Sequence, residues 1–249
     1  MTTRFVGNTL GSKKAIVIGA TSGIGRKLAE VLAKNGYMVG ITGRRSSLLS
    51  ELEKTIPEVF IPESFDVTDM KNTVESLERL VQKTGGCDLL VLSSGTGDLN
   101  PTLEFDLEKD TIDVNVAGFT NIADWIFRYF KHQGHGHLVV LTSIGGLRGS
   151  PDAPAYNASK AYQINYLEGL QKKAALLHQD ITITDIRPGL VDTAMAKGDG
   201  LFWVMPVEKA ARQIYAVIKS KKRVAYVTRR WGMVALALRL LPRWMYNRI

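Results

Sequence analysis

Short apolar runs alternate with longer segments of helical spacing along most of this chain, and no other feature of the sequence limits the fold as strongly. Five largely apolar runs stand out, at residues 15–19, 38–42, 89–93, 138–142 and 181–186. Nearly continuous apolar character is typical of strands in a parallel sheet whose two faces are both covered by helices. The pattern therefore predicts an α/β protein, a doubly wound three-layer sandwich with a central parallel sheet.

The segments between these runs complete the predicted architecture. Helices are expected at residues 24–35, 46–55, 71–83, 107–133 and 156–178, and two further strands at 59–65 and 224–228. No repeat, low-complexity tract or linker interrupts this order, so residues 1–228 are predicted to form a single domain. Residues 229–249 would follow it as a basic amphipathic extension. Ligands of such sheets bind beyond the carboxyl ends of the strands, which the loops 95–101, 145–154 and 193–206 follow.

The positive charge of the chain is concentrated near its carboxyl end. Residues 209–249 contain eleven Lys or Arg and no Asp or Glu, whereas the first 208 residues carry 21 basic and 24 acidic side chains. The formal net charge of +8 therefore describes the end of the chain and not its body. Such a segment can attract anionic lipid, nucleic acid or an acidic partner, or it can be an ordinary solvated surface. Because no nucleic-acid-binding module is recognised, no nucleic-acid partner is predicted.

The extension has the spacing of an amphipathic helix. Val234, Leu238, Leu241 and Met245 share one helical stripe, and Pro242 would break or kink the helix. Two tryptophans and a tyrosine in the same segment suit an interface between water and hydrocarbon. The segment could lie on an anionic membrane, fold over the mouth of a substrate site, or pack between two copies of the chain. At the level of sequence these alternatives stay open.

Cysteine and histidine content argues against a disulfide or a metal site. The single cysteine, Cys87, excludes an internal disulfide and a cysteine-rich metal centre. His132, His135 and His137 lie in a glycine-rich segment without a neighbouring carboxylate or cysteine, which favours a solvated loop and no bound metal. Residues 1–11 lack a secretory apolar stretch, and no run of 18 apolar residues occurs. The expected location is cytoplasmic, with a possible peripheral contact at the inner face of a membrane.

A glycine-rich loop separates the first strand from the first helix. It reads Gly-Ala-Thr-Ser-Gly-Ile-Gly from residue 19 to residue 25. Glycine lets phosphate approach the backbone, and the helix that follows offers free N–H groups and the positive end of its dipole. In this position the loop favours a dinucleotide site, although such a loop can also be only a tight structural turn. The predicted cofactor contacts here are Gly19, Thr21, Ser22, Gly23, Ile24 and Gly25.

The end of the second strand bears on the choice between NAD and NADP. In dinucleotide sites an acid in this region binds the ribose 2′-hydroxyl, whereas an arginine accommodates a 2′-phosphate. The chain has Arg44 and Arg45 here and no acid. Arg44 is the predicted partner of the phosphate, and Arg45 would stack on or bracket the adenine. The sequence therefore predicts NADP(H) in preference to NAD(H). Alternatively, the two arginines are ordinary solvated side chains that bind no phosphate.

A serine, a tyrosine and a lysine form the candidate catalytic group. Tyr156 and Lys160 are four residues apart in a predicted helix, which puts both on one face. A nearby ammonium favours phenolate and so lowers the pKa of a tyrosine. Ser143 follows a predicted strand and could hydrogen-bond a substrate oxygen as charge develops on it. A surface Tyr–Lys pair is the alternative, and the serine together with the upstream glycine loop weighs against it.

These motifs together resemble the short-chain dehydrogenase/reductase family in its single-domain form. The resemblance covers nearly all of residues 13–228. It rests on Gly19-x-x-x-Gly23-x-Gly25, Asp66-Val67, Asn115, Ser143, Tyr156-x-x-x-Lys160 and Pro188-Gly189-Leu190-Val191-Asp192-Thr193. The family resemblance implies a Rossmann-type fold for the catalytic domain and a homo-oligomer.

The resemblance also implies roles for the four catalytic candidates. Tyr156 would donate a proton in ketone reduction or act as the base in alcohol oxidation. Lys160 would tune that tyrosine and hold the nicotinamide ribose, while Ser143 would orient the substrate. Asn115 would bend a central helix and hold a water of the proton relay.

The remaining cofactor contacts follow from the same resemblance. They are Asp66, Val67, Ser93, Gly95, Pro188, Gly189, Val191 and Thr193. Two positions depart from the family pattern: Ser93 stands in place of an asparagine that ties strands together, and Ile18 in place of a threonine. Both changes affect support and cofactor contacts and leave the four catalytic positions filled.

The sequence thus predicts an NADP(H)-dependent oxidoreductase that interconverts a carbonyl compound and an alcohol by hydride transfer. A hydrophobic ketone or aldehyde is the expected small-molecule substrate, because the residues in or near the substrate loops are largely apolar. They are Leu147, Leu190, Met195, Leu201, Phe202, Trp203 and Met205. The alternative is a non-catalytic dinucleotide-binding sensor or scaffold, against which the complete catalytic set argues.

Overall fold

The computed structural model describes residues 13–194 and 203–248, and this part of the chain confirms the predicted α/β sandwich. Its strands form one parallel sheet in the order β3-β2-β1-β4-β5-β6-β7. They are β1 (Lys13–Ile18), β2 (Tyr37–Gly43), β3 (Phe60–Ser64), β4 (Leu89–Leu92), β5 (His135–Leu141), β6 (Asp180–Pro188) and β7 (Val224–Val227). Each coincides with a strand expected from the sequence.

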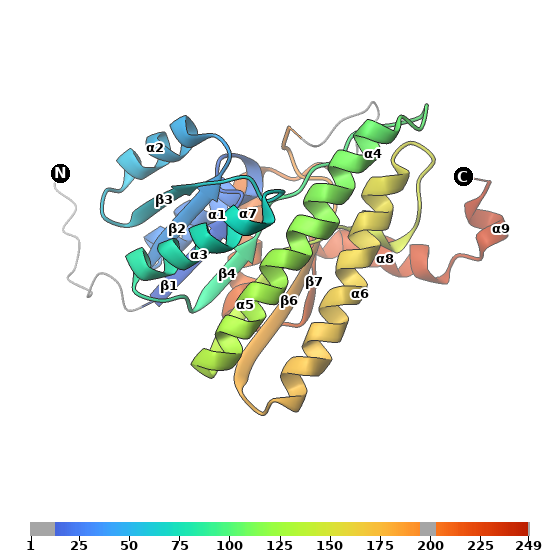
Figure 1. Ribbon diagram of the computed structural model, residues 1–249. Coiled ribbons are helices and arrows are strands. Elements are labelled where there is room, and N and C mark those ends of the chain that lie inside the picture. The colour runs from blue at the N-terminus through green and yellow to red at the C-terminus, as the bar shows by residue number, and fades with distance from the viewer. Residues whose placement is uncertain (1–12, 195–202, 249) are drawn as a thin grey trace, which may run out of the picture.

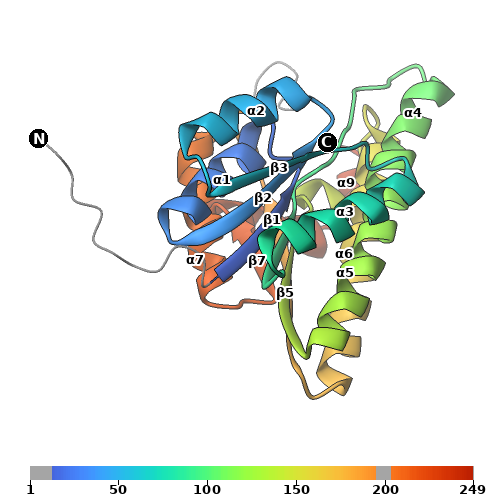
Figure 2. The same ribbon diagram turned by 60° about the vertical axis from the view of Figure 1, so that its left-hand side comes forward.

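Helices cover both faces of the sheet (Figures 1 and 2). One face carries α1 (Gly23–Lys34), α2 (Ser46–Thr55) and α7 (Val207–Lys219). The other carries α3 (Met70–Thr84), α5 (Phe119–Gln133) and α6 (Pro154–Leu176). Helix α4 (Phe105–Ile112) precedes α5 in the second layer and packs against α6, whereas α8 (Arg229–Leu240) and α9 (Arg243–Tyr246) follow the last strand.

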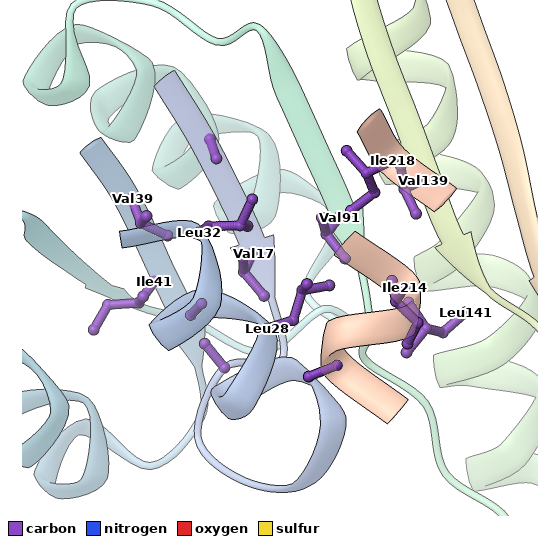
Figure 3. Close-up of a cluster of buried hydrophobic side chains, with 14 of the residues drawn as sticks. Val17, Leu28, Leu32, Val39, Ile41, Val91, Val139, Leu141, Ile214 and Ile218 are labelled. Atoms are coloured by element: carbon purple, nitrogen blue, oxygen red, sulfur yellow. The ribbon is translucent and has the colours of Figure 1, made fainter. Parts of the chain in front are cut away.

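The strand period of two residues divides the core between the two faces. In β1, Val17 points to the α1 and α7 side, and its neighbours Ile16 and Ile18 point to the α3 and α5 side. Figure 3 shows Val17 beside Leu28 of α1, with Ile214 of α7 in the same cluster. Burying one such side chain stabilises the fold by about 1.5–3 kcal/mol. The continuous apolar runs of the sequence are therefore explained by a sheet with two buried faces.

The helix expected at residues 107–133 is interrupted. After α4, residues Asp113–Gly118 form a π-helical segment, and α5 follows. The wider turn of a π-helix leaves backbone carbonyls free for other donors. Asn115, where the resemblance implied a bend, lies in this segment and is fully buried. The range expected to be helical is confirmed, although apolar periodicity alone does not indicate the single wide turn.

The histidine-rich segment is not the solvated loop expected from the sequence. Helix α5 ends at Gln133, the turn at Gly134 has φ 85°, and β5 begins with the next residue. His137 is buried in β5, with its Nε2 2.7 Å from the Thr184 Oγ1 of β6. Burial lowers the pKa of His137 to about 4, so the ring is neutral at pH 7. Within residues 13–194 and 203–248, no three His, Cys, Asp or Glu side chains group as metal ligands would.

The carboxyl-terminal extension packs against the body of the protein. Helix α8 ends at Leu240, and Pro242 caps α9, so the expected break falls at the proline. Trp231 is buried, whereas Met245 of the expected stripe is exposed. No helix in the described part of the chain is long and apolar enough to cross a bilayer.

The order of the strands creates a crevice beside β1. The chain runs from β1 through β2 to β3 on one side and resumes at β4 on the other. Connections on the two sides leave in opposite directions, which opens the space beyond the carboxyl ends of β1 and β4. The loops that carry the predicted site residues follow these strand ends.

Candidate active site

A cavity of about 530 Å³ lies at this crevice and collects most of the predicted site. Of the sixteen residues expected to bind cofactor, fifteen line it: Gly19, Thr21, Ser22, Gly23, Ile24, Arg44, Arg45, Asp66, Val67, Ser93, Gly95, Pro188, Gly189, Val191 and Thr193. The exception is Gly25. Ser143 and Lys160 line the same cavity, whereas Tyr156 and Asn115 stand behind its wall.

The glycine loop is shaped by close backbone contacts. Gly19 has φ 87°, and its amide and that of Ala20 bond the Thr42 carbonyl at 3.1 and 2.8 Å, which ties the loop to the end of β2. A Cβ on Gly25 would lie 2.2 Å from the Gly19 oxygen, so this glycine supports the loop from beneath. The cavity wall here consists of backbone at the amino end of α1, the arrangement that binds a pyrophosphate.

Two arginines and one carboxylate form the far end of the cavity. Arg45 donates from Nη2 to Thr21 Oγ1 at 2.7 Å and to Ser22 Oγ at 3.0 Å. Arg44 is exposed and reaches Asp66 Oδ2 at 3.5 Å. Burial favours the neutral acid at Asp66, but hydrogen bonds from Thr68 and the charge of Arg44 hold its pKa below the usual value. Arg45 thus bonds the glycine loop, and its expected place beside the adenine stays a prediction.

The chain therefore fits a dinucleotide on structural grounds. A Cβ on Gly19 or Gly25 would come within 3 Å of neighbouring backbone, so the loop requires these glycines, and the α1 amino terminus borders the cavity. Arg44 and Arg45 supply positive charge at one end, and Lys160 supplies it at the other. The residues from Gly19 to Gly25 would hold the phosphates, Asp66 and Val67 the adenine, and Lys160 the ribose next to the reacting end.

Ser143 and Tyr156 meet at the reacting end. Ser143 is the last residue before a short 3₁₀ turn at Ile144–Leu147, and its Oγ accepts the Gly145 amide at 2.9 Å. Tyr156 lies in the first turn of α6 and hydrogen-bonds Ser143. Burial raises the pKa of Tyr156, and the bond with Ser143 acts in the opposite direction. The phenol is accordingly in its protonated form at pH 7.

Lys160 is held by acceptors behind the cavity wall. Its Nζ donates to the Leu141 carbonyl at 3.2 Å and to Gln163 Oε1 at 3.0 Å, and it stands 5.9 Å from the centre of the Tyr156 ring. Burial lowers the pKa of Lys160 to about 8, and the charge of Asp185 opposes this shift. The expected lowering of the Tyr156 pKa by Lys160 is not found, because burial of the phenol dominates.

Gln163 links Lys160 to the π-helical segment and was not identified from the sequence. Its Oε1 accepts from Lys160, and its Nε2 donates to the Asn115 carbonyl at 2.8 Å. The Asn115 side chain donates from Nδ2 to Thr96 O at 2.6 Å and to Ser159 Oγ at 3.0 Å. The resemblance assigned a water to this place in the relay. The Asn115 carbonyl accepts the Gln163 amide, and the water of the relay stays a prediction.

The sequence did not indicate several other residues that line the cavity. They are Thr42, Gly43, Phe65, Ser94, Thr96, Val114, Leu141, Thr142 and Ala194. Several of them end or directly follow a strand, so the strand boundaries alone could have indicated them.

The expected substrate loops are only partly in place around the cavity. Leu190 lines it, whereas Trp203 and Met205 line a second hollow beside α7 and β7. Trp203 lies edge-on to Trp231, with 6.1 Å between ring centres. Of the other expected residues, Met195, Leu201 and Phe202 lie outside the described part of the chain.

The sequence matches the family model described as short chain dehydrogenase over residues 13–200. An uncharacterized oxidoreductase of Staphylococcus saprophyticus is 35% identical over 193 residues, which are 75% of this chain and 82% of that protein. A probable NADP-dependent dehydrogenase of Haemophilus influenzae is 30% identical over 71% of this chain and 70% of its own length. The chain belongs to the short-chain dehydrogenase family.

Solved structures with the same fold include members with a bound dinucleotide. The 3-ketoacyl-(acyl-carrier-protein) reductase of Brucella melitensis complexed with NADH gives a TM-score of 0.79 at 20% identity, over 88% of this chain and 97% of that one. ElxO with NADP bound gives 0.75 at 23% identity, over 86% and 96%. At these identities the likeness concerns the fold. Family and fold together define an oxidoreductase that works with a nicotinamide cofactor.

Proposed function

We propose that this protein is an NADP(H)-dependent oxidoreductase that interconverts a hydrophobic ketone or aldehyde and the corresponding alcohol. The observation that carries the proposal is that Ser143 and Lys160 line one end of a cavity whose other end holds Arg44 and Arg45, with Tyr156 beside both of them behind the cavity wall. The glycine loop lies between the two ends. A dinucleotide bound along this cavity would bring its nicotinamide to the hydroxyl groups.

In the reductive direction the chain supplies the proton and orients the substrate. The bound nicotinamide supplies the hydride. Tyr156, protonated because burial raises its pKa, donates its phenolic proton to the substrate oxygen as negative charge builds there. The Ser143 hydroxyl bonds the same oxygen and fixes the carbonyl. Lys160 places a positive charge near the phenolate that remains, which offsets the cost of forming an anion in a buried site.

The hydrogen bond from Lys160 to Gln163 helps to position the lysine, and this role can be tested. Replacing Gln163 by Leu removes an acceptor from the ammonium and leaves the Asn115 carbonyl without its donor. Losing a hydrogen bond to a charged group costs about 1.5–3 kcal/mol, so kcat/KM should fall about tenfold or more. The pKa of Lys160 should also fall. Since the charged lysine is the active form, the alkaline loss of activity should then begin at a lower pH.

Gln171→Leu is the matched control for this experiment. Gln171 lies on the same helix and bonds the Ile183 and Arg223 carbonyls at 3.2 and 2.9 Å, away from Lys160. This variant should lose stability without a displaced pH profile. An unchanged profile in Gln163→Leu, measured as kcat/KM across the pH range, would contradict a positioning role for Gln163.

The preference for NADP(H) is supported by the two arginines at the adenine end of the cavity. Arg44→Ala should raise the Kd for NADPH about tenfold or more and leave the Kd for NADH nearly unchanged, because only NADPH carries the 2′-phosphate. The loss would also leave Asp66 facing that phosphate without its counter-ion. Fluorescence titration with both dinucleotides measures the effect. Lys54→Ala, an exposed cation in the last turn of α2, is the control.

A hydrophobic substrate is supported by the loop that follows β4. A Cβ on Gly97 would lie 2.3 Å from the Tyr156 ring, so this loop passes directly over the catalytic tyrosine. Its neighbours Leu99 and Leu103, as well as Phe105 at the start of α4, are exposed. Exposed apolar side chains on and beside the loop that covers Tyr156 favour a carbonyl compound with little charge.

The protein is also expected to form a homo-oligomer. The second candidate function is a dinucleotide-binding sensor or scaffold. A panel of carbonyl and alcohol substrates, run in parallel with NADPH/NADP and NADH/NAD, tests the proposal. We expect turnover that is faster with NADPH and increases with substrate hydrophobicity. Tight NADPH binding without turnover of any compound would favour the sensor.

A further inference from the structure

Helix α8 carries apolar side chains on two opposite faces. The inner face comprises Trp231, Ala235 and Leu238, and the outer face comprises Met233, Leu236 and Leu240. Both sets repeat at intervals of three and four residues, and at about 100° per residue their centres lie on opposite sides of the helix. The outer side chains are 67%, 59% and 73% exposed. A helix that is apolar on both sides needs a partner on each of them.

The partner of the inner face is the body of the protein itself. The Trp231 ring lies against the turn after β6, where a Cβ on Gly189 would come within 2.3 Å of it. Arg148 donates from Nε to the Leu238 carbonyl at 2.8 Å and from Nη2 to the Leu241 carbonyl. Tyr246 of α9 donates to the Gly149 carbonyl at 2.6 Å. These contacts attach α8 and α9 to the loop that leads from Ser143 to Tyr156. The outer face of α8 is therefore held turned away from the body of the protein.

Positive charge borders the outer face on both sides. Arg230 and Arg239 each project about 90° from the centre of the apolar stripe, one to each side. Both are exposed. In α9, Trp244 is 62% exposed, with the guanidinium of Arg248 5.6 Å from its ring centre. No acidic residue occurs from position 209 to the end of the sequence.

We propose that the outer surface of α8 and α9, formed by Met233, Leu236, Leu240 and Trp244, docks on an anionic lipid surface. An apolar stripe between arginines, with an indole at its end, matches a membrane whose hydrocarbon begins beneath negatively charged head groups. Lipid phosphates would neutralise the arginines. A second copy placed symmetrically on this surface would instead bring like charges together. Figure 1 shows α8 and α9 at the margin of the molecule, projecting past α6.

The docked orientation would place the entrance of the cavity near the lipid, since the same loop carries Arg148 and begins at Ser143. This consequence rests on the proposed oxidoreductase function, whereas the docking itself does not. A hydrophobic carbonyl compound dissolved in the membrane would then reach Tyr156 over a short path. Binding to lipid and turnover are measured separately, so one can fail without the other.

Vesicle flotation of the full-length protein tests the docking. We expect binding to vesicles of phosphatidylcholine mixed with phosphatidylglycerol, weaker binding to phosphatidylcholine alone, and a decrease when salt is raised. In Leu236→Ser/Leu240→Ser the affinity should fall about tenfold or more, because two leucines no longer enter hydrocarbon. Leu176→Ser is the matched control, since Leu176 is 79% exposed at the end of α6, remote from α9 in Figure 1.

A second variant, Arg239→Gln/Arg243→Gln, removes one exposed arginine from α8 and one from α9, and it leaves the apolar stripe unchanged. It should lose the preference for phosphatidylglycerol and keep the wild-type melting temperature. The proposal is overturned if the wild-type protein does not float with anionic vesicles, or if it binds neutral and anionic vesicles equally. It is also overturned if Leu236→Ser/Leu240→Ser binds as well as wild type. A dimer in solution that this leucine variant abolishes would assign the surface to a second copy instead.

Discussion

Replacing Tyr156 by Phe should lower kcat for carbonyl reduction by about a hundredfold to ten-thousandfold. This is the range that one positioned proton donor contributes, and Phe has the same ring without the proton. Because Tyr156 stands behind the wall of the dinucleotide cavity, the Kd for NADPH should stay within about twofold of wild type. Steady-state kinetics with a reducible ketone, together with fluorescence titration of NADPH, measures both quantities.

Tyr162→Phe provides the control on the same helix. The Tyr162 hydroxyl lies 2.9 Å from Thr120 Oγ1 on the surface of α6, and neither residue lines the cavity. This variant should keep nearly the full rate. If Tyr156→Phe reduces ketones as fast as Tyr162→Phe does, the proton comes from another group and the proposed mechanism is wrong.

Replacing Asp185 by Ala should destabilise the protein by about 3–5 kcal/mol. Asp185 is 1% exposed, and its Oδ2 accepts from Arg187 Nε at 2.7 Å and Nη2 at 2.6 Å. Thr142 donates to its other oxygen. Burial raises the pKa of Asp185, with Arg187 acting against that shift, so desolvation and pairing are both large. Removing the carboxylate leaves the Arg187 charge buried without a counter-ion.

Two further variants separate the buried pair from ordinary surface charge. Asp180 begins the same strand and pairs with Lys221 at 2.7 Å, but it is largely exposed, so Asp180→Ala should cost less than about 1 kcal/mol. Asp185→Leu/Arg187→Met removes both charges and should recover much of the loss. Urea denaturation measures all three. Equal losses for Asp185→Ala and Asp180→Ala would mean that the buried pair contributes no more than an exposed one.

Much of the fold and of the cofactor site could be predicted, because their determinants are local. The apolar runs define the strands, and a doubly wound order brings their carboxyl ends to one crevice. The loop from Gly19 to Gly25 needs only its own glycines and the helix that follows. Tyr156 and Lys160 share a helix face through their spacing alone. These predictions depend on residues that are close together in the sequence.

The electrostatic balance of the site could not be predicted in the same way. The pKa of Tyr156 depends on burial beneath the loop at Gly97, and that of Lys160 on burial beside Asp185. Gln163 has the ordinary appearance of a polar residue in a helix until Asn115 is brought beside it by the π-helical turn. His137 was misplaced for a related reason, since Thr184 meets it only when β5 and β6 pair.

By itself, the sequence determined the class of fold, the position of the glycine loop and the residues from which a proton relay can be built. Only the tertiary structure decided which charges are buried, what each polar group bonds, and which face of α8 is turned outward. The physical reason is that periodicity and spacing act within a single segment. Desolvation and hydrogen-bond satisfaction are instead set by segments distant in the chain, as when Arg148 reaches the carbonyls of α8 and fixes its orientation.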